Sequence, residues 1–181
     1  NRRRRCSLLV ERVQGQGKVT RVLVDCSPDL RMQLLDAEVD WIDGVLVTHE
    51  HADHTHGIDD LRPLFVSKRR RVDVYLDEPT SRAMHARFGY CFMTPPGSEY
   101  PSIANEKRLI AGKPVTIRGQ GGAMELLPVL QDHGDLAAAK AAQLVLAAAH
   151  QLLAVEADRA RHDASGRIED ADDRESGHRL A

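Results

Sequence analysis

Short apolar runs of strand length recur along the first 130 residues of the chain. Residues 6–13 and 19–26 flank the turn 14–17, whose two glycines favour a β-hairpin. Residues 44–47, Gly-Val-Leu-Val, form an unbroken apolar run that is typical of a short buried strand. The remaining strands are predicted at residues 72–76, 114–117 and 124–130. The chain is therefore expected to build a sheet from many short strands.

Segments between these strands have the features of helices. A Ser-Pro-Asp sequence at residues 27–29 opens the first, because Ser27 can cap a helix, proline suits its first turn, and aspartate favours the positive end of its dipole. Residues 57–65 and 79–88 are the other predicted helices, and Pro63 is tolerable near an end or a kink. Strands that alternate with helices predict an α/β protein.

The composition changes abruptly after Gly134. Residues 135–160 are dominated by alanine and leucine, which favour a helix. From Arg161 onward the chain is polar and without aromatic residues, which is typical of a disordered end. We therefore predict a domain over residues 1–134 and a helical, then disordered tail over residues 135–181. A shifted reading frame in GC-rich DNA would produce such a tail, and a genuine helical extension is the alternative.

Charge and cysteine content limit the expected binding partners and cellular compartment of the protein. The 25 basic and 27 acidic side chains nearly balance, so nothing general favours nucleic acid or an anionic membrane as partner. Cys6, Cys26 and Cys91 are widely spaced and odd in number, and they form neither a C-x-x-C metal pair nor a disulfide framework. No apolar run is long enough to cross a bilayer, and no signal peptide opens the chain. A cytoplasmic protein is expected.

Four residues of the metal-ligand type follow the apolar run 44–47. They are His49, His51, Asp53 and His54, in the spacing H-x-H-x-D-H. Alternate residues of an extended chain point the same way, so His49 and His51 can converge as the strand ends, while Asp53 and His54 can face a second point nearby. Imidazole and carboxylate groups suit zinc, manganese or iron. The spacing favours a metal site over a loop that is rich in histidine by chance.

This spacing resembles the signature of the metallo-β-lactamase superfamily of metal-dependent hydrolases. Residues 21–26 resemble the family's preceding strand, and residues 126–134 resemble a later strand that delivers the metal-binding His133. The sequence of residues 48–64, T-H-E-H-A-D-H-T-H-G-I-D-D-L-R-P-L, is most similar to a phosphodiesterase branch of the superfamily. That branch includes the phosphoribosyl cyclic phosphate phosphodiesterase of phosphonate breakdown. The resemblance covers about residues 1–134.

The resemblance implies an α/β fold, the αββα sandwich of the superfamily, which this chain would carry incompletely. It implies that His49, His51 and His133 hold one metal ion and that Asp53 and His54 hold a second, the ions being zinc or manganese. Two such ions would share a hydroxide that attacks the substrate, and Asp53 would orient it. The family's bridging aspartate, its final histidine and its first glycine-rich loop have no counterpart in the sequence, so the chain is expected to be truncated.

Several further polar side chains have candidate roles beside this centre. Asp25 would hydrogen-bond a ligand histidine or a water, and the alternative is a carboxylate that caps a local turn. His56 and Arg62 are candidate substrate-binding residues, although Arg62 can instead pair with neighbouring aspartates. The basic runs 2–5 and 68–71 are short and lack interleaved aromatic residues, so solvated surface is favoured over a phosphate-binding patch.

The function predicted from these residues is a metal-dependent hydrolase. The phosphodiesterase branch implies a small phosphorylated substrate, such as a nucleotide or ribose phosphate, including cyclic forms. Other members of the superfamily are the alternatives: an RNA-processing nuclease, a thioesterase or a lactamase. A truncated, non-catalytic metal-binding fragment is a further alternative, because ligands are missing. The sequence leaves a homodimer open.

Overall fold

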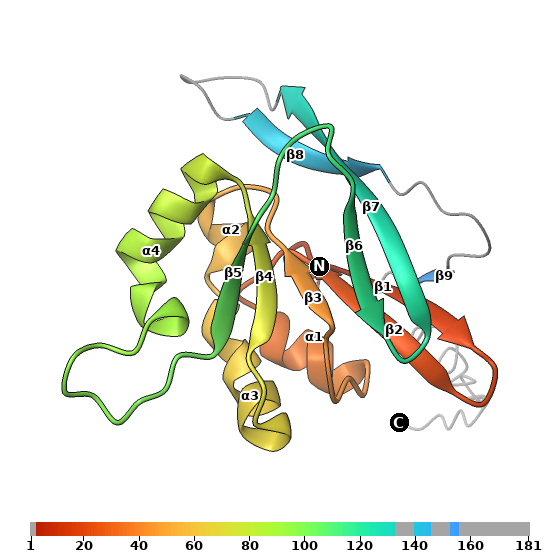
Figure 1. The fold of residues 1–181 in the computed structure, drawn as a ribbon, viewed down its shortest axis with the longest axis horizontal. Coiled ribbons are helices and arrows are strands. Elements are labelled where there is room, and N and C mark those ends of the chain that lie inside the picture. Colours follow the sequence, from red (N-terminus) through yellow and green to blue (C-terminus); the bar gives the residue numbers. More distant parts are fainter. Residues whose placement is uncertain (1–2, 133–139, 146–152, 156–181) are drawn as a thin grey trace, which may run out of the picture.

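The computed structural model describes residues 3–132, 140–145 and 153–155, of which residues 131–132 and the last two segments are described by their backbone alone. Within these residues the chain forms two β-sheets and one layer of helices (Figure 1). None of the described helices is long and apolar enough to cross a membrane.

The larger sheet has six strands in the order β5-β4-β3-β2-β1-β9. Its strands are β1 Leu8–Gln14, β2 Lys18–Val24, β3 Gly44–Leu46, β4 Val72–Leu76, β5 Ala104–Arg108 and β9 Leu153–Val155. Strands β2, β3, β4 and β5 run parallel, whereas β1 is antiparallel to both β2 and β9. The predicted hairpin at residues 14–17 is confirmed, because β1 and β2 pair directly across that turn.

The smaller sheet has three antiparallel strands in the order β6-β7-β8. They are β6 Val115–Gly119, β7 Gly122–Asp132 and β8 Lys140–Val145. The helices are α1 Leu30–Asp36, α2 Ala52–Thr55, the 3₁₀ turn η1 Ile58–Leu61, α3 Arg62–Lys68 and α4 Glu78–Phe92. The helices predicted at residues 57–65 and 79–88 are therefore confirmed, and Pro63 lies in the first turn of α3, where proline is tolerated.

Alternating side chains of the larger sheet serve two separate hydrophobic cores. Leu23 and Val45 point to the core shared with the helices, which includes Leu30, Leu61 and Met84. Their neighbours Val22 and Leu46 point to the other face and pack against Ile117, Met124 and Leu126 of the smaller sheet. The order helix, sheet, sheet is that of the predicted αββα sandwich, and a second helical layer is not found among the residues described.

Two predictions about secondary structure are wrong. Residues 135–160 were expected to be helical, but within them Lys140–Val145 is strand β8 and Leu153–Val155 is strand β9. The other residues of this segment and the disordered end predicted from Arg161 lie outside the described residues. Residues 140–145 extend the edge of β7 by pairing with residues 127–132. A ladder to an existing strand can outweigh helix propensity, which favours alanine by only about 0.7 kcal/mol per residue over ordinary residues. The division at residue 134 stays a prediction.

The start of α1 also differs from the prediction. The helix begins at Leu30, with Asp29 before it, and no side chain caps it. The Ser27 hydroxyl instead donates to Oε1 of the buried Gln33, at 2.8 Å, and accepts a hydrogen bond from the Asp29 amide at 3.2 Å. The Ser27 side chain therefore stabilises the loop before the helix and does not cap its first turn.

Candidate metal centre

One end of the larger sheet gathers the candidate ligands. Strands β2 and β3 are parallel, so the residues that follow their carboxyl ends, Asp25 and 48–54, lie at the same edge. Strand β1 is antiparallel to β2 and brings its amino end, with Cys6 and Ser7, to that edge as well. Segments that are distant in sequence thus meet where the parallel strands end.

His49 and His51 converge as the sequence predicts. The Nε2 atom of His49 lies 3.0 Å from Nδ1 of His51, and their ring centroids are 4.5 Å apart. The Thr48 hydroxyl lies 2.9 Å from Nδ1 of His49, so that nitrogen is engaged and Nε2 is turned toward His51. His49 is only 3% exposed, which fixes its ring in one orientation.

The spacing of these two nitrogens fits metal binding. Two nitrogens bound to one ion at 2.0–2.1 Å would be about 2.9 Å apart in octahedral geometry and about 3.4 Å apart in tetrahedral geometry. The observed separation of 3.0 Å falls in this range. The His54 ring packs against His49 with a centroid distance of 4.1 Å, so all three imidazoles of the motif form one cluster.

Asp25 orients His54 and the beginning of the ligand loop. Asp25 is 5% exposed, and its carboxylate lies 2.7 Å from Nδ1 of His54. It also accepts hydrogen bonds from the Thr48 amide at 2.7 Å and from the Thr48 hydroxyl at 2.9 and 3.0 Å. The hydrogen bond that His54 donates to Asp25 raises the pKa of His54, against the opposing effect of burial. The expected contact between Asp25 and a ligand-type histidine is present.

The backbone of Asp25 is in a conformation that side chains rarely adopt. Its φ is +65°, in the left-handed region, where aspartate and asparagine are tolerated better than most residues. The Asp25 amide donates to the Leu46 carbonyl at 2.8 Å, and the next amide, of Cys26, donates to the His54 carbonyl at 2.7 Å. These bonds hold the corner in place and tie it to both ends of the ligand loop, which is how strain persists at a functional site.

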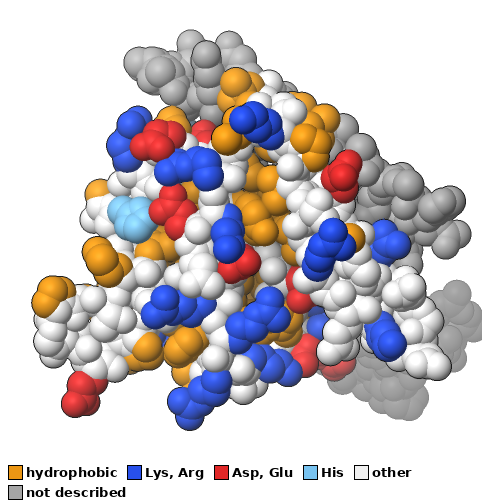
Figure 2. Space-filling view, viewed as in Figure 1, with side chains coloured by type: hydrophobic (Ala, Val, Ile, Leu, Met, Phe, Trp, Pro, Cys, Tyr) orange, Lys and Arg blue, Asp and Glu red, His pale blue; other side chains and the backbone are white. Residues whose placement is uncertain are grey.

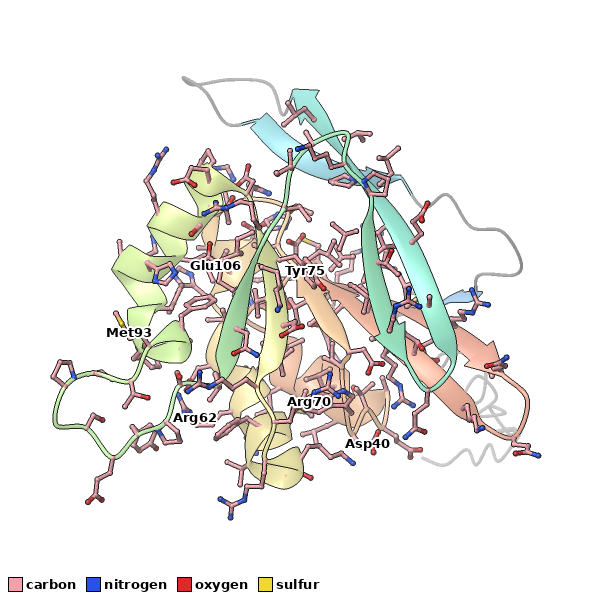
Figure 3. The ribbon with its side chains drawn as sticks, in the orientation of Figure 1. Asp40, Arg62, Arg70, Tyr75, Met93 and Glu106 are labelled. Carbon is pink, nitrogen blue, oxygen red and sulfur yellow. The ribbon has the colours of Figure 1, made fainter. Side chains whose placement is uncertain are left out.

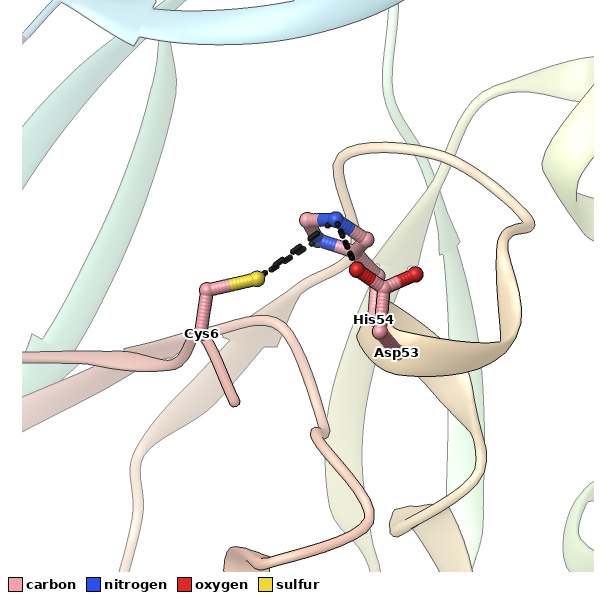
Figure 4. Close-up of side chains that lie close together, drawn as sticks. All are labelled: Cys6, Asp53 and His54. Carbon is pink, nitrogen blue, oxygen red and sulfur yellow. Dashed lines mark hydrogen bonds and ion pairs between the residues drawn. The ribbon is translucent and has the colours of Figure 1, made fainter. Parts of the chain in front are cut away.

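Asp53, His54 and Cys6 form a second group of donors (Figure 4). An oxygen of Asp53 lies 3.4 Å from Nε2 of His54, and the Asp53 side chain is 54% exposed. The Cys6 sulfur lies 3.5 Å from the same Nε2 atom. Burial, together with the charges of Asp25 and Asp53, raises the pKa of the Cys6 thiol.

Cys6 was not among the predicted site residues. The signal that could have found it is the register of the predicted hairpin. Leu8 pairs with Val24 across the turn, so continuing the register by two positions sets Cys6 opposite Cys26, next to Asp25. The register depends on the turn geometry, which the apolar pattern alone left undefined.

Among the described residues, His56 and Arg62 lie outside this cluster. His133 falls outside the described residues, so its predicted role stays a prediction. His56 is exposed and its ring packs edge-on against Phe88 at 5.4 Å. Arg62 pairs with Asp59 at 2.8 Å, as its alternative role predicted, and its guanidinium lies 4.8 Å from the centre of the Tyr100 ring, beside the 94–103 loop (Figure 3).

The basic runs make ordinary surface contacts. Arg4 pairs with Asp36 and Arg5 with Asp29. In the second run, Lys68 pairs with Asp40 at 3.0 Å and Arg70 stacks on Trp41 at 5.0 Å (Figure 3). Figure 2 shows Lys and Arg side chains scattered over this face, with Asp and Glu beside several of them. This pattern agrees with the surface interpretation of the two runs.

Gly57 fixes how the ligand loop packs on the sheet. Its amide donates to the Cys26 carbonyl at 2.9 Å, and a Cβ at this position would lie 1.9 Å from the Ser27 carbonyl oxygen. We therefore expect Gly57→Ala to lower the free energy of unfolding by about 3 kcal/mol, the upper part of the range for overpacking, since backbone must move. Denaturant unfolding would measure it.

The matched control for this substitution is Gly89→Ala in α4. A Cβ there would meet nothing within 4 Å, so this substitution should be neutral or stabilise the protein by up to about 1 kcal/mol. An equal, small effect of both substitutions would contradict the packing role of Gly57.

Comparison with known proteins agrees with this geometry. The family model described as the β-lactamase superfamily domain matches residues 20–163, more than half of the chain. The chain belongs to the β-lactamase superfamily. The match includes most of β2, all of β3 and the H-x-H-x-D-H loop, and it continues beyond residue 134 through β8 and β9. The predicted resemblance is thus confirmed at the level of the superfamily and its fold.

Two proteins similar to this β-lactamase superfamily domain are both longer than it. A solved structure titled a new diphosphatase from the PhnP family has a TM-score of 0.62 and 30% identity, and the match covers 80% of this chain and 49% of that one. A curated protein of Porphyromonas gingivalis, named octanoyltransferase, is 42% identical over 96 residues, which are 53% of this chain and 18% of that protein. The chain thus spans at most half the length of either.

Proposed function

We propose that this domain belongs to a metal-dependent hydrolase that cleaves phosphoester bonds in a small substrate. The observation that carries the proposal is the spacing of the His49 and His51 nitrogens, 3.0 Å apart at the end of β3, which suits two ligands of one ion. Asp53 and His54 lie next to this pair and offer ligands for a second ion. Divalent ions bound there would polarise a phosphoryl group and acidify an attacking water.

The side chains of the chain itself orient the donor atoms. Asp25 accepts a hydrogen bond from Nδ1–H of His54, which leaves Nε2 as the atom of that ring that can bind a metal ion. Thr48 engages Nδ1 of His49 in the same way. In both rings the nitrogen without this partner carries the lone pair that a cation needs. The exposed carboxylate of Asp53 can in addition accept a proton from a water that approaches from solvent.

The phosphoester substrate class is inferred from two similarities. It derives from the likeness of residues 48–64 to a phosphodiesterase branch and from the similarity to a structure whose title names a diphosphatase. Both point to substrates with a phosphorus centre, and a nucleotide or ribose phosphate, cyclic forms included, is the proposed class. The name octanoyltransferase does not transfer, since the shared segment is 18% of that protein. A cytoplasmic location stays a prediction.

Metal counting and a hydrolysis assay test the proposal together. The purified chain should bind two zinc or manganese ions by elemental analysis and hydrolyse a bis-aryl phosphate. Treatment with a chelator should abolish turnover, and adding the metal back should restore it, because the ions supply the Lewis acid. No more than one ion and no turnover would overturn the proposal and favour the non-catalytic alternative. Turnover of a thioester or a β-lactam in place of the phosphodiester would support a hydrolase but assign it a different substrate class.

A further inference from the structure

We infer that Cys6 is a metal ligand, whose thiolate completes a zinc-type site with Asp53 and His54. The inference rests on the metal centre of the proposed function, which it deepens by adding a sulfur donor. The three side chains form the group of ligand-type donors whose atoms all lie within 4.8 Å of one another in the described part of the chain (Figure 4). The H-x-H-x-D-H motif supplies two of them, and the third comes from the start of the β1–β2 hairpin.

The separations of these donor atoms match those around one tetrahedral zinc ion. With Zn–S near 2.3 Å and Zn–N near 2.0–2.1 Å, sulfur and nitrogen ligands lie about 3.5 Å apart, and nitrogen and oxygen ligands about 3.4 Å apart. The Cys6 sulfur lies 3.5 Å from Nε2 of His54 and 3.6 Å from its Nδ1, and the Asp53 oxygen lies 3.4 Å from Nε2. The donors are close enough to share an ion once the Cys6 side chain rotates toward Nε2.

The orientation of His54 leaves the correct atom for this role. Its Nδ1 is held by Asp25 at 2.7 Å, so Nε2, the atom nearest to both other donors, is available to a cation. A histidine that binds metal through one nitrogen and donates from the other to a carboxylate is the usual arrangement in metalloproteins. The buried Asp25 thus orients His54 within the Cys6-Asp53-His54 site.

Neighbouring residues on both sides of Cys6 fix its position. The Arg5 amide donates to Asp29 at 2.8 Å. On the other side, the Ser7 hydroxyl donates to the Asp25 carbonyl at 3.0 Å and accepts from the Ser27 amide at 3.1 Å. These bonds tie the amino end of β1 to the corner that carries Asp25. Cys6 is therefore presented by a braced segment, although its side chain is exposed.

A thiolate at this position determines which metal the site prefers. Thiolates are soft ligands that favour zinc over manganese or magnesium, whereas a site of oxygen and imidazole ligands would admit manganese. The inference therefore narrows the proposed ions to zinc at the position held by Cys6, Asp53 and His54. The pair formed by His49 and His51 carries no sulfur and keeps the wider choice.

Cobalt(II) is the probe for this inference, because it replaces zinc and reports its ligands in its absorption. The wild-type chain titrated with cobalt should show the near-ultraviolet thiolate-to-cobalt charge-transfer band, and Cys6→Ser should lose it. Zinc affinity, measured by competition with a chromophoric chelator, should fall at least about tenfold in Cys6→Ser, since even loss of an outer-shell partner costs 10–100-fold. Cys6→Asp should recover much of the affinity without the band.

The remaining cysteines provide an internal control. Cys26 and Cys91 are buried and stay in every variant, so a band that persists in Cys6→Ser would overturn the inference. Should the variants fold poorly, zinc protection answers the question in the wild type: bound zinc should block alkylation of Cys6 by iodoacetamide, and unchanged alkylation would also overturn it. Turnover without the cobalt band would support the proposed hydrolase and contradict the role of Cys6 as a ligand. The band without turnover would support the role of Cys6 and contradict the proposed hydrolase.

Discussion

Replacing Asp53 by alanine should remove one of two bound ions and lower kcat by about 10²–10⁴-fold, the range typical for a side chain that transfers or positions a proton. The carboxylate lies 3.4 Å from Nε2 of His54, so its loss takes away a ligand of the Cys6-Asp53-His54 site. The Asp53 side chain is 54% exposed, so its removal leaves no cavity in the core. Folding should therefore be preserved while activity is lost.

Elemental analysis and steady-state kinetics on a bis-aryl phosphate would measure this effect, with thermal unfolding as the test of folding. Glu50→Ala is the matched control, because it removes a carboxylate from the same loop that lies outside the Cys6-Asp53-His54 group. This control should keep both ions and turn over within about twofold of the wild type, in line with the small effects of surface substitutions. An Asp53→Ala variant with full turnover and two ions would contradict the proposed centre.

Asp25→Asn should weaken zinc binding by about 10–100-fold without removing any metal ligand. Both Asp25 oxygens accept: one from the Thr48 amide, the other from Nδ1 of His54, and the Thr48 hydroxyl reaches both. An amide turns one of these acceptors into a donor, so a buried N–H loses its partner. This should also lower the stability of the metal-free protein by about 1–3 kcal/mol.

Asparagine is the informative replacement because it isolates hydrogen bonding from backbone strain. The φ of +65° at this position is tolerated by asparagine nearly as well as by aspartate, whereas alanine would add a conformational cost. Chelator competition would give the zinc affinity, and denaturant unfolding of the metal-free protein would give the stability.

Asp43→Asn, at the opposite end of β3, is the control that separates the effect on zinc affinity from the effect on stability. The Asp43 carboxylate also accepts two N–H donors, the Arg21 amide at 2.9 Å and the Trp41 indole at 3.1 Å, but it lies away from the ligand loop. Its substitution should lower stability and leave zinc affinity unchanged. Equal zinc affinity in wild type and Asp25→Asn would show that Asp25 has only a structural role.

The strands that surround the ligand loop could be predicted because their signals are local. The unbroken apolar run at 44–47 corresponds to β3, and residues on both sides of the turn 14–17 correspond to β1 and β2. Strand β5, Ala104–Arg108, was missed because its sequence, Ala-Asn-Glu-Lys-Arg, is polar. As an edge strand of the described sheet it pairs on one side with β4, and pairing between backbones needs no apolar side chains.

The tail shows the reverse error, in which a strong local signal was misleading. Alanine-rich residues 140–145 have high helix propensity, yet they form β8 along the free edge of β7. Which edge is free depends on how the two sheets are built from distant segments. That information is not present within any window of the tail sequence, so composition could not reveal it.

The sequence by itself determined the superfamily, the metal-ligand motif, and the convergence of His49 and His51, because alternation along an extended chain fixes which residues share a side. Only the tertiary structure decided that Asp25 supports His54 and that Cys6 joins Asp53 and His54. These contacts join residues that lie 29 and 48 positions apart. Parallel pairing of β2 with β3 and the register of the β1–β2 hairpin bring them together. Register depends on turn geometry as well as on the apolar pattern, so alternation within one strand does not specify these contacts.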